Sequence, residues 1–177
     1  SCPKLTHYRL QLDRIRRQRA HTLSPECEAL LASAGQLSGA PDEIFSLLND
    51  ADMAFPDALD SAGQPHPVTH GTFVPLLQST DRTLRKNAFD SLYSVYHQFR
   101  NTSSAVLSAQ MQQLQFFANA RHYDSALHAA LNGTEVPVEI YHNLIDSVRQ
   151  NFPAMHRYVK LRKKLLGVDD LHFYDLY

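Results

Sequence analysis

Apolar residues recur along most of the chain at steps of three and four residues, the spacing of one helix face. Near the N-terminus this pattern combines with start signals such as Ser24 followed by Pro25, which favour a helix cap and a first helical turn. Three helices are therefore predicted before the first break, over residues 8–20, 24–34 and 41–51. In the first helix, Tyr8, Leu12 and Ile15 are expected to form a buried stripe opposite an arginine-rich face.

The segment from 54 to 69 breaks the helical pattern. Pro56, Gly63, Pro65 and Pro67 would each interrupt a helix, and the residues just before Gly63 are turn formers. A small β-hairpin is predicted here. Its prolines would restrict the two strands to the edge of a sheet.

The strongest periodic pattern follows this hairpin. Leu84, Ala88 and Leu92 begin a series of apolar positions that continues to Ala118. The series predicts one long helix of up to about 35 residues, or roughly 50 Å. Only the polar residues 101–104 are expected to be able to bend it.

Three more helices are predicted after this long one. Asp124 is expected to cap a short helix that ends in a left-handed turn at Asn132-Gly133. Pro137 begins the next helix, and Pro153 is expected to separate it from the last one. Gly167 would end that last helix in a Schellman turn.

Together these elements predict an all-α fold, a multi-helix lobe with one long helix and a small hairpin near residues 54–69. The lobe is expected to be a single helical region, 1–177. Its predicted parts are the N-terminal helices (1–53), the hairpin (54–70) and the long helix with its successors (71–177). Because the chain starts without Met and stops on an aromatic stretch, we also expect it to be a fragment of a larger protein.

Charge and composition exclude several classes of protein. The 17 Lys and Arg residues nearly balance the 18 Asp and Glu residues, so no overall field would attract nucleic acid or an acidic membrane. No apolar run is long enough for a membrane helix. Cys2 and Cys27 are too sparse for a disulfide framework, which favours a cytoplasmic location. Neither nucleic acid nor a membrane is expected as a partner.

With 10 histidines, the chain has to be tested for metal-ligand spacing. His66 and His70 stand four residues apart, but Pro65 and Pro67 prevent the helix that would place both rings on one face. No Glu follows the first of them, as the zinc-peptidase motif requires. Neither histidine is therefore assigned to a metal.

The other chemistry-bearing residues also favour structural roles. His122 and His128 flank Asp124 at a spacing that suits a helix cap or a surface. The chain contains no nucleophile elbow, phosphate-binding loop or dinucleotide fingerprint. Four tyrosines are interpreted as packing or surface residues rather than substrate contacts: Tyr93, Tyr96, Tyr123 and Tyr158. No catalytic, metal-binding or substrate-binding residue is assigned.

Two basic clusters remain, at residues 14–19 and 157–164. Either could contact phosphates. In both, however, the cations alternate with apolar residues at helical spacing, which is the pattern of the solvent-facing side of a packed helix. We interpret both clusters in that way.

Seven stretches together resemble the oligoendopeptidase F family of zinc peptidases, relatives of thimet oligopeptidase. They are HTLSPE (21–26), EIFSLLNDAD (43–52), THG (69–71), DRTLRKNAF (81–89), YHNLI (141–145), HRYVKLRKKLLG (156–167) and LHFYDLY (171–177). The likeness covers nearly the whole chain, although none of the stretches is a catalytic motif.

The resemblance implies a zinc metalloendopeptidase that hydrolyses short unstructured peptides. The family holds zinc with H-E-x-x-H and a downstream Glu, and the Glu of the motif activates the zinc-bound water. None of this occurs in the 177 residues. We therefore expect zinc in the full-length protein and none bound by this segment, which would be inactive alone.

The same resemblance implies a structural role for the segment. It would form the helical scaffold and the wall of the substrate channel upstream of the metal site, and the stretch from residue 171 would pack on the missing catalytic region. That region and peptide substrates are the expected partners, and the exposed face could also bind a second copy.

Two other classes of function stay open. An autonomous all-α module would bind a peptide or a partner helix in an apolar groove, and would be monomeric with cooperative melting. A truncated lobe would instead self-associate or bind a hydrophobic dye. A nucleic-acid-binding protein would lose affinity steeply with salt, and lose it entirely when Arg16 and Arg17 are replaced by Ala.

Overall fold

The computed structural model describes residues 3–177, with side chains described from Thr6 onward, and it is mainly α-helical. Cys2 lies outside the described residues. The chain divides into two compact units. Unit 1 contains residues up to Glu43 together with Val106–His142, and unit 2 contains Ile44–Ala105 together with Asn143–Tyr177.

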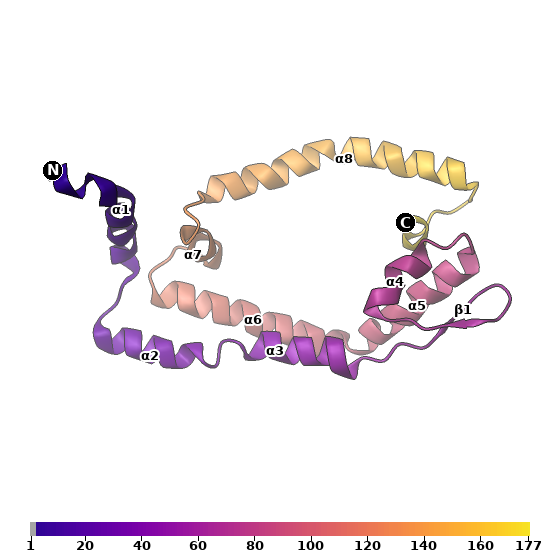
Figure 1. Cartoon of the computed structure of the whole chain (residues 1–177), viewed down its shortest axis with the longest axis horizontal. Coiled ribbons are helices and arrows are strands. Elements are labelled where there is room, and N and C mark those ends of the chain that lie inside the picture. Colours follow the sequence, from indigo (N-terminus) through magenta and orange to yellow (C-terminus); the bar gives the residue numbers. More distant parts are fainter. Residues whose placement is uncertain (1–2) are drawn as a thin grey trace. The chain divides into compact units, whose positions relative to one another are not determined.

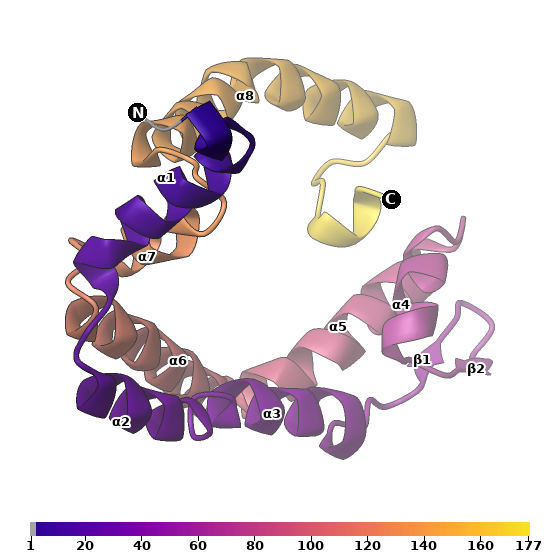
Figure 2. The same ribbon diagram turned by 60° about the vertical axis from the view of Figure 1, so that its left-hand side comes forward.

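Unit 1 begins with short helices. A 3-10 turn (Pro3–Tyr8) leads into α1 (Arg9–Gln18), a second 3-10 turn (Arg19–His21), α2 (Pro25–Gly35) and the start of α3 (Ala40–Leu47). The rest of the unit is most of α6 (Arg100–Ala120), α7 (Ala126–Asn132) and the first residues of α8 (Val138–Leu166). Figures 1 and 2 show these elements from two directions.

The first helices of unit 1 confirm one expectation and correct another. Ser24 caps α2 as predicted, since its side chain accepts a hydrogen bond from the Cys27 backbone N–H. The buried stripe predicted for α1 is wrong, because none of the described residues of α1 is buried and Ile15 is 55% exposed. The helical period was correct, but nothing within the described chain covers that face.

Unit 2 contains the predicted hairpin. Strands β1 (Ala58–Leu59) and β2 (Pro65–His66) pair antiparallel, with Ala58 opposite His66 and Leu59 opposite Pro65. Gly63 lies in the turn at φ +80°, a conformation that glycine adopts without steric cost. The proline in β2 is tolerated because a two-stranded sheet consists only of edge strands.

The other elements of unit 2 are mostly helices. After the end of α3, a π-helical turn (Leu48–Asp52) precedes the hairpin, and α4 (His70–Leu77) and α5 (Arg82–Gln98) follow it. Most of α8 and a 3-10 turn (Phe173–Asp175) complete the unit. Thr69 and Thr72 form a reciprocal capping box at the start of α4.

The hydrophobic core of unit 2 forms between the hairpin, α4 and α5, which Figure 1 shows side by side. Its buried members are Ala58, Val68, Leu84, Ala88 and Leu92. Partly buried Phe55, Phe73, Leu76 and Tyr96 pack around them. The apolar series that begins at Leu84 therefore marks the buried face of α5, as its period predicted.

In unit 2, the helix boundaries near residues 99 and 153 differ from the prediction. The long helix is interrupted at Phe99, where φ −94° and ψ 11° leave the α-helical region, so that α5 and α6 are separate helices. Conversely, α8 runs through Pro153 as one helix. Proline leaves the carbonyl group of Arg149 without its helical partner, and the exposure of Arg149 allows water to take that place.

The last helix ends as predicted. Gly167 adopts φ +63°, and its N–H donates to the carbonyl oxygen of Lys164. Among the described residues, none of the helices combines the length and the hydropathy needed to cross a membrane.

Candidate functional site

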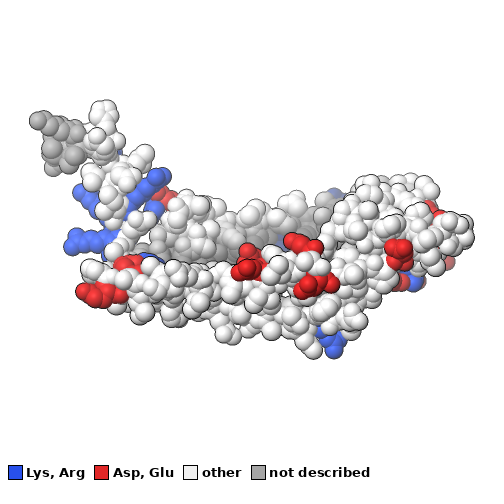
Figure 3. All heavy atoms as spheres, turned by 60° about the horizontal axis from the view of Figure 1, so that its bottom comes forward, with Lys and Arg blue, Asp and Glu red and all other residues white. Residues whose placement is uncertain are grey.

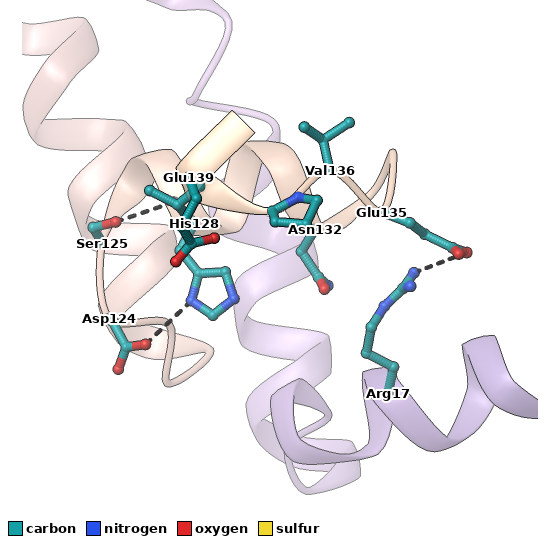
Figure 4. A pocket seen from close by; sticks show the side chains of 10 residues that line it. Arg17, Asp124, Ser125, His128, Asn132, Glu135, Val136 and Glu139 are labelled. Carbon is teal, nitrogen blue, oxygen red and sulfur yellow. Dashed lines mark hydrogen bonds and ion pairs between the residues drawn. The ribbon is translucent and has the colours of Figure 1, made fainter. Parts of the chain in front are cut away.

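A cavity of about 530 Å³ lies within unit 1, next to α7 (Figure 4). One side is formed by the apolar segment Val136–Val138. Polar side chains from α1, α7, the adjoining loops and the start of α8 surround it: Arg17, Asp124, His128, Asn132, Glu135 and Glu139. The cavity thus combines an apolar surface with charged groups of both signs.

The two ends of α7 position most of these side chains, and both differ from the prediction. The cap is Ser125 rather than Asp124, because Ser125 Oγ accepts a hydrogen bond from the backbone N–H of His128 at 3.0 Å. At the other end Gly133 is right-handed at φ −63°, and Glu135 takes the left-handed conformation at φ 61°. The turn is thus two residues later than the glycine suggests.

The left-handed position directs Glu135 toward α1. Its carboxylate accepts one hydrogen bond from Arg14 at 2.9 Å and lies 3.2 Å from a guanidinium nitrogen of Arg17. Hydrogen bonds from Arg17 and Arg14 hold the pKa of Glu135 below its usual value. The basic cluster at residues 14–19 is therefore partly neutralised inside the chain.

Ser125, His128 and Asp124 are the residue types of a hydrolytic triad, but their geometry is different. Asp124 lies 3.3 Å from Nδ1 of His128, while Ser125 Oγ is occupied by the backbone N–H at the start of α7 (Figure 4). Among the described contacts, none joins Ser125 Oγ to the imidazole ring. A serine nucleophile requires that contact, so this trio has no basis as a nucleophilic site.

Replacing Ser125 with Ala is expected to destabilise α7 by about 1 kcal/mol, because the first turn loses its cap. Hydrogen exchange of the amides of α7 would measure the effect. Asp124→Ala is the matched control and should leave that exchange almost unchanged. Equal effects of the two substitutions would show that Asp124 contributes to the cap.

A stack of two rings contacts the cavity lining through Asn132. Tyr123 stacks on His21 with ring centroids 3.7 Å apart, and its hydroxyl accepts a hydrogen bond from Asn132 at 2.8 Å. Arg121 binds the carboxylate of Glu28 through two nitrogens, at 2.9 and 2.8 Å. The hydrogen bond from Arg121 lowers the pKa of Glu28. These contacts connect α2 to the loop that carries the cavity.

The histidines singled out for metal spacing have other partners. Nε2 of His66 lies 3.1 Å from Asp60, and Nε2 of His70 lies 3.1 Å from the backbone oxygen of Asn49. Across the part of the chain that the structure describes, no three His, Cys, Asp or Glu side chains come together as metal ligands do. These residues do not fit a zinc ion, and we assign no hydrolytic step to them.

A second group of polar side chains, in unit 2, was missed by the sequence analysis. Asp175 is 1% exposed, and its carboxylate accepts hydrogen bonds from Arg82 at 3.1 and 3.0 Å and from Arg85 at 2.9 Å. Burial raises the pKa of Asp175, but the hydrogen bonds from Arg82 and Arg85 outweigh it and hold the pKa well below its usual range. The feature of the sequence that could have indicated this cluster is the position of acidic Asp175 within the aromatic stretch 171–177.

This ion-pair cluster holds the C-terminal residues on α5. Arg85 also donates to the backbone oxygen of Tyr174. Tyr174 is buried, with 8% of its surface exposed, and its ring centroid lies 5.9 Å from that of Phe89. The expectation that the stretch from residue 171 packs on a missing region is therefore corrected for Tyr174 and Asp175. Phe173 and Tyr177 are about half exposed.

The four tyrosines fall into two groups. Tyr96 donates to Asn49 at 2.6 Å and packs in the core, where burial raises its pKa, and Tyr123 belongs to the ring stack described above. Tyr93 and Tyr158 are 42% and 58% exposed. Both nevertheless have contacts within the chain, because the ring of Tyr93 packs against that of Phe89 and the hydroxyl of Tyr158 accepts a hydrogen bond from Arg162.

Figure 3 shows how charged side chains are distributed over one face of the surface. On the face drawn in Figure 3, Lys and Arg gather toward the left-hand end, acidic residues occur in small groups, and broad uncharged areas separate them. In the second basic cluster, Arg162 turns back to donate to the backbone oxygens of Asp175 and Tyr177.

Comparisons with solved structures and with curated sequences show that this helical chain is similar to part of known peptidases. An oligoendopeptidase F from Enterococcus faecium matches 99% of this chain with a TM-score of 0.92 and 44% identity, over 34% of its own length. Oligopeptidase PepF of Bacillus subtilis is 41% identical over 98% of this chain and 26% of its own. Group B oligopeptidase PepB of Streptococcus agalactiae is 41% identical over 99% of this chain and 29% of its own.

Family models agree with these similarities. The model "Peptidase family M3" matches residues 75–177, more than half of the chain, and the model "Oligopeptidase F" matches residues 1–55. The chain belongs to the oligoendopeptidase F family of peptidase family M3. It spans about a quarter to a third of the length of the relatives named above.

Proposed function

We propose that this chain is the helical scaffold and substrate-channel wall of a zinc-dependent oligoendopeptidase that hydrolyses short unstructured peptides. The observation that carries the proposal is the match of two family models to residues 1–55 and 75–177, combined with a fold that agrees with a solved oligoendopeptidase F. The residues described here supply no metal ligands in this proposal. The metal and the catalytic groups would come from another part of a longer polypeptide.

Zinc would supply an activated water and polarise the peptide carbonyl group in such an enzyme. The contribution of this chain would be different: to shape the path of the substrate and to hold the catalytic region in place. A cytoplasmic location is part of the proposal, and the free, exposed thiol of Cys27 suits a reducing compartment.

The test compares residues 1–177 with the complete polypeptide in the presence of zinc. We expect no hydrolysis of a short fluorogenic peptide by residues 1–177, and hydrolysis by the complete polypeptide that a chelator abolishes. Removal of the metal should leave the helical content of residues 1–177 unchanged. Tight binding of one zinc ion by residues 1–177, with chelator-sensitive cleavage, would contradict the proposal.

The same samples distinguish the autonomous binding module. Residues 1–177 carry many exposed apolar side chains, among them Leu30, Leu107, Met111 and Leu165 at 62–79% exposure. A scaffold that needs its catalytic region should therefore self-associate or bind a hydrophobic dye. A monomer that melts cooperatively and binds no dye would favour the module instead.

A further inference from the structure

Helix α8 carries an uncovered apolar surface on one side. In unit 2, Leu144, Val148, Met155, Tyr158 and Leu166 lie at steps of three, four, seven and eight residues, which place them on one helix face. All five are exposed, between 41% and 62%. We call these five residues the α8 stripe. None of the described residues of α8 is buried. Arg162 lies on the same face between Tyr158 and Leu166, where it donates to the Tyr158 hydroxyl and to the backbone oxygens of Asp175 and Tyr177.

The opposite face of the helix is charged. Asp146, Arg149, Lys160 and Lys164 lie there and are exposed. A helix with one apolar and one charged face is typical of a helix that is covered on one side and solvated on the other. An open groove of about 320 Å³, lined by Val148, Phe152 and Met155 among others, runs along the apolar side.

The N-terminal part of the stripe is its most exposed part. Leu144, Val148 and Met155 are 51–62% exposed, so this part of the stripe would need a covering surface from outside the described residues of unit 2.

The relatives contain enough additional chain to provide that cover. This chain corresponds to 29% of group B oligopeptidase PepB and to 34% of the solved Enterococcus faecium chain, so about two thirds of each lies outside the match. A covering segment within one polypeptide also avoids the loss of translational freedom that a separate partner would suffer on binding.

We propose that the α8 stripe is the docking face for the part of the longer polypeptide that lies outside these 177 residues, through an apolar surface of that part. The inference rests on the proposed function, since it assumes a longer enzyme. Contacts at Leu144, Val148 and Met155 exclude water from the interface, while the charged face of α8 stays in solvent.

Thiol labelling tests this contact directly. Met155→Cys places a thiol in the stripe, and Lys160→Cys places a matched thiol on the charged face. N-ethylmaleimide is the probe, and mass spectrometry of the labelled peptide separates these thiols from Cys27. In residues 1–177, diluted until sizing shows a monomer, both thiols should react rapidly. In the complete polypeptide, the thiol at 155 should react at least tenfold more slowly, and the thiol at 160 at an unchanged rate.

The labelling rates either support or overturn the docking of the α8 stripe. Equal labelling of residue 155 in both forms would overturn the proposal, and so would protection that disappears when the complete polypeptide is diluted to a monomer, since a second copy would then be the cover. Val148→Cys repeats the measurement if Met155→Cys disturbs folding. Protection in a complete polypeptide that lacks peptidase activity would support the docking face and contradict only the proposed function.

Discussion

Replacing Asp175 with Ala is expected to lower the free energy of unfolding of unit 2 by about 3–5 kcal/mol, the usual cost of removing one partner of a buried ion pair. Arg85, itself 8% exposed, would lose the carboxylate that it contacts at 2.9 Å and remain a buried charge without its counter-ion. The C-terminal 3-10 turn would also lose its attachment to α5. Urea denaturation followed by circular dichroism, together with hydrogen exchange of α5 amides, measures this loss.

The matched control is Asp90→Ala on the same helix. Asp90 pairs with Lys86 at 2.6 Å, but both side chains are more than half exposed, so little change in stability is expected. If Asp175→Ala proves as mild as Asp90→Ala, the buried ion pair does not hold the C-terminal residues on α5.

The dependence on pH gives this prediction a second check. The pKa of Asp175 is lower in the folded chain than in the unfolded chain, so its contribution is fully present above the unfolded value of about 3.9. That contribution is lost as the pH falls from there toward the folded value, because the unfolded chain takes up the proton first. Asp175→Asn should flatten this acid part of the stability profile. An unchanged slope below pH 4 would contradict the assignment.

Replacing Leu77 with Ala is expected to lower the free energy of unfolding of unit 2 by about 2–5 kcal/mol, because a fully buried side chain would leave a cavity. Leu77 is the last residue of α4 and has no exposed surface. Thermal unfolding and urea denaturation of the two chains measure the difference. Val74→Ala, on the same helix but 39% exposed, is the control and should cost clearly less. Equal losses would mean that α4 does not depend on its buried face.

Much of the secondary structure could be predicted because local chemistry decides it. The cap at Ser24, the hairpin around Gly63 and the helix end at Gly167 each depend on residues within one turn of each other. The errors arose where two local preferences compete. Around α7, Asp124 and Ser125 are both good caps. The left-handed turn at Glu135 instead goes against local preference, since residues other than glycine rarely adopt positive φ.

The candidate cavity and the ion-pair cluster were not predictable to the same degree. Glu135 meets Arg14 from 121 positions away, and Asp175 meets Arg85 from 90 positions away. Periodicity describes neighbours along one element and contains no information on such distant pairs. The acidic residue inside an aromatic stretch indicated that Asp175 would need a partner, but not which one.

The sequence by itself determined the helical character of this protein, the position of its hairpin and its resemblance to one peptidase family, because these depend on spacing, capping residues and matching stretches. Only the tertiary structure decided which apolar faces are buried. The face of α5 that begins at Leu84 packs into a core, whereas the equally periodic faces of α1 and α8 stay uncovered in the described chain. The physical reason is that the helical period defines an apolar face, while burial depends on whether another surface lies against it.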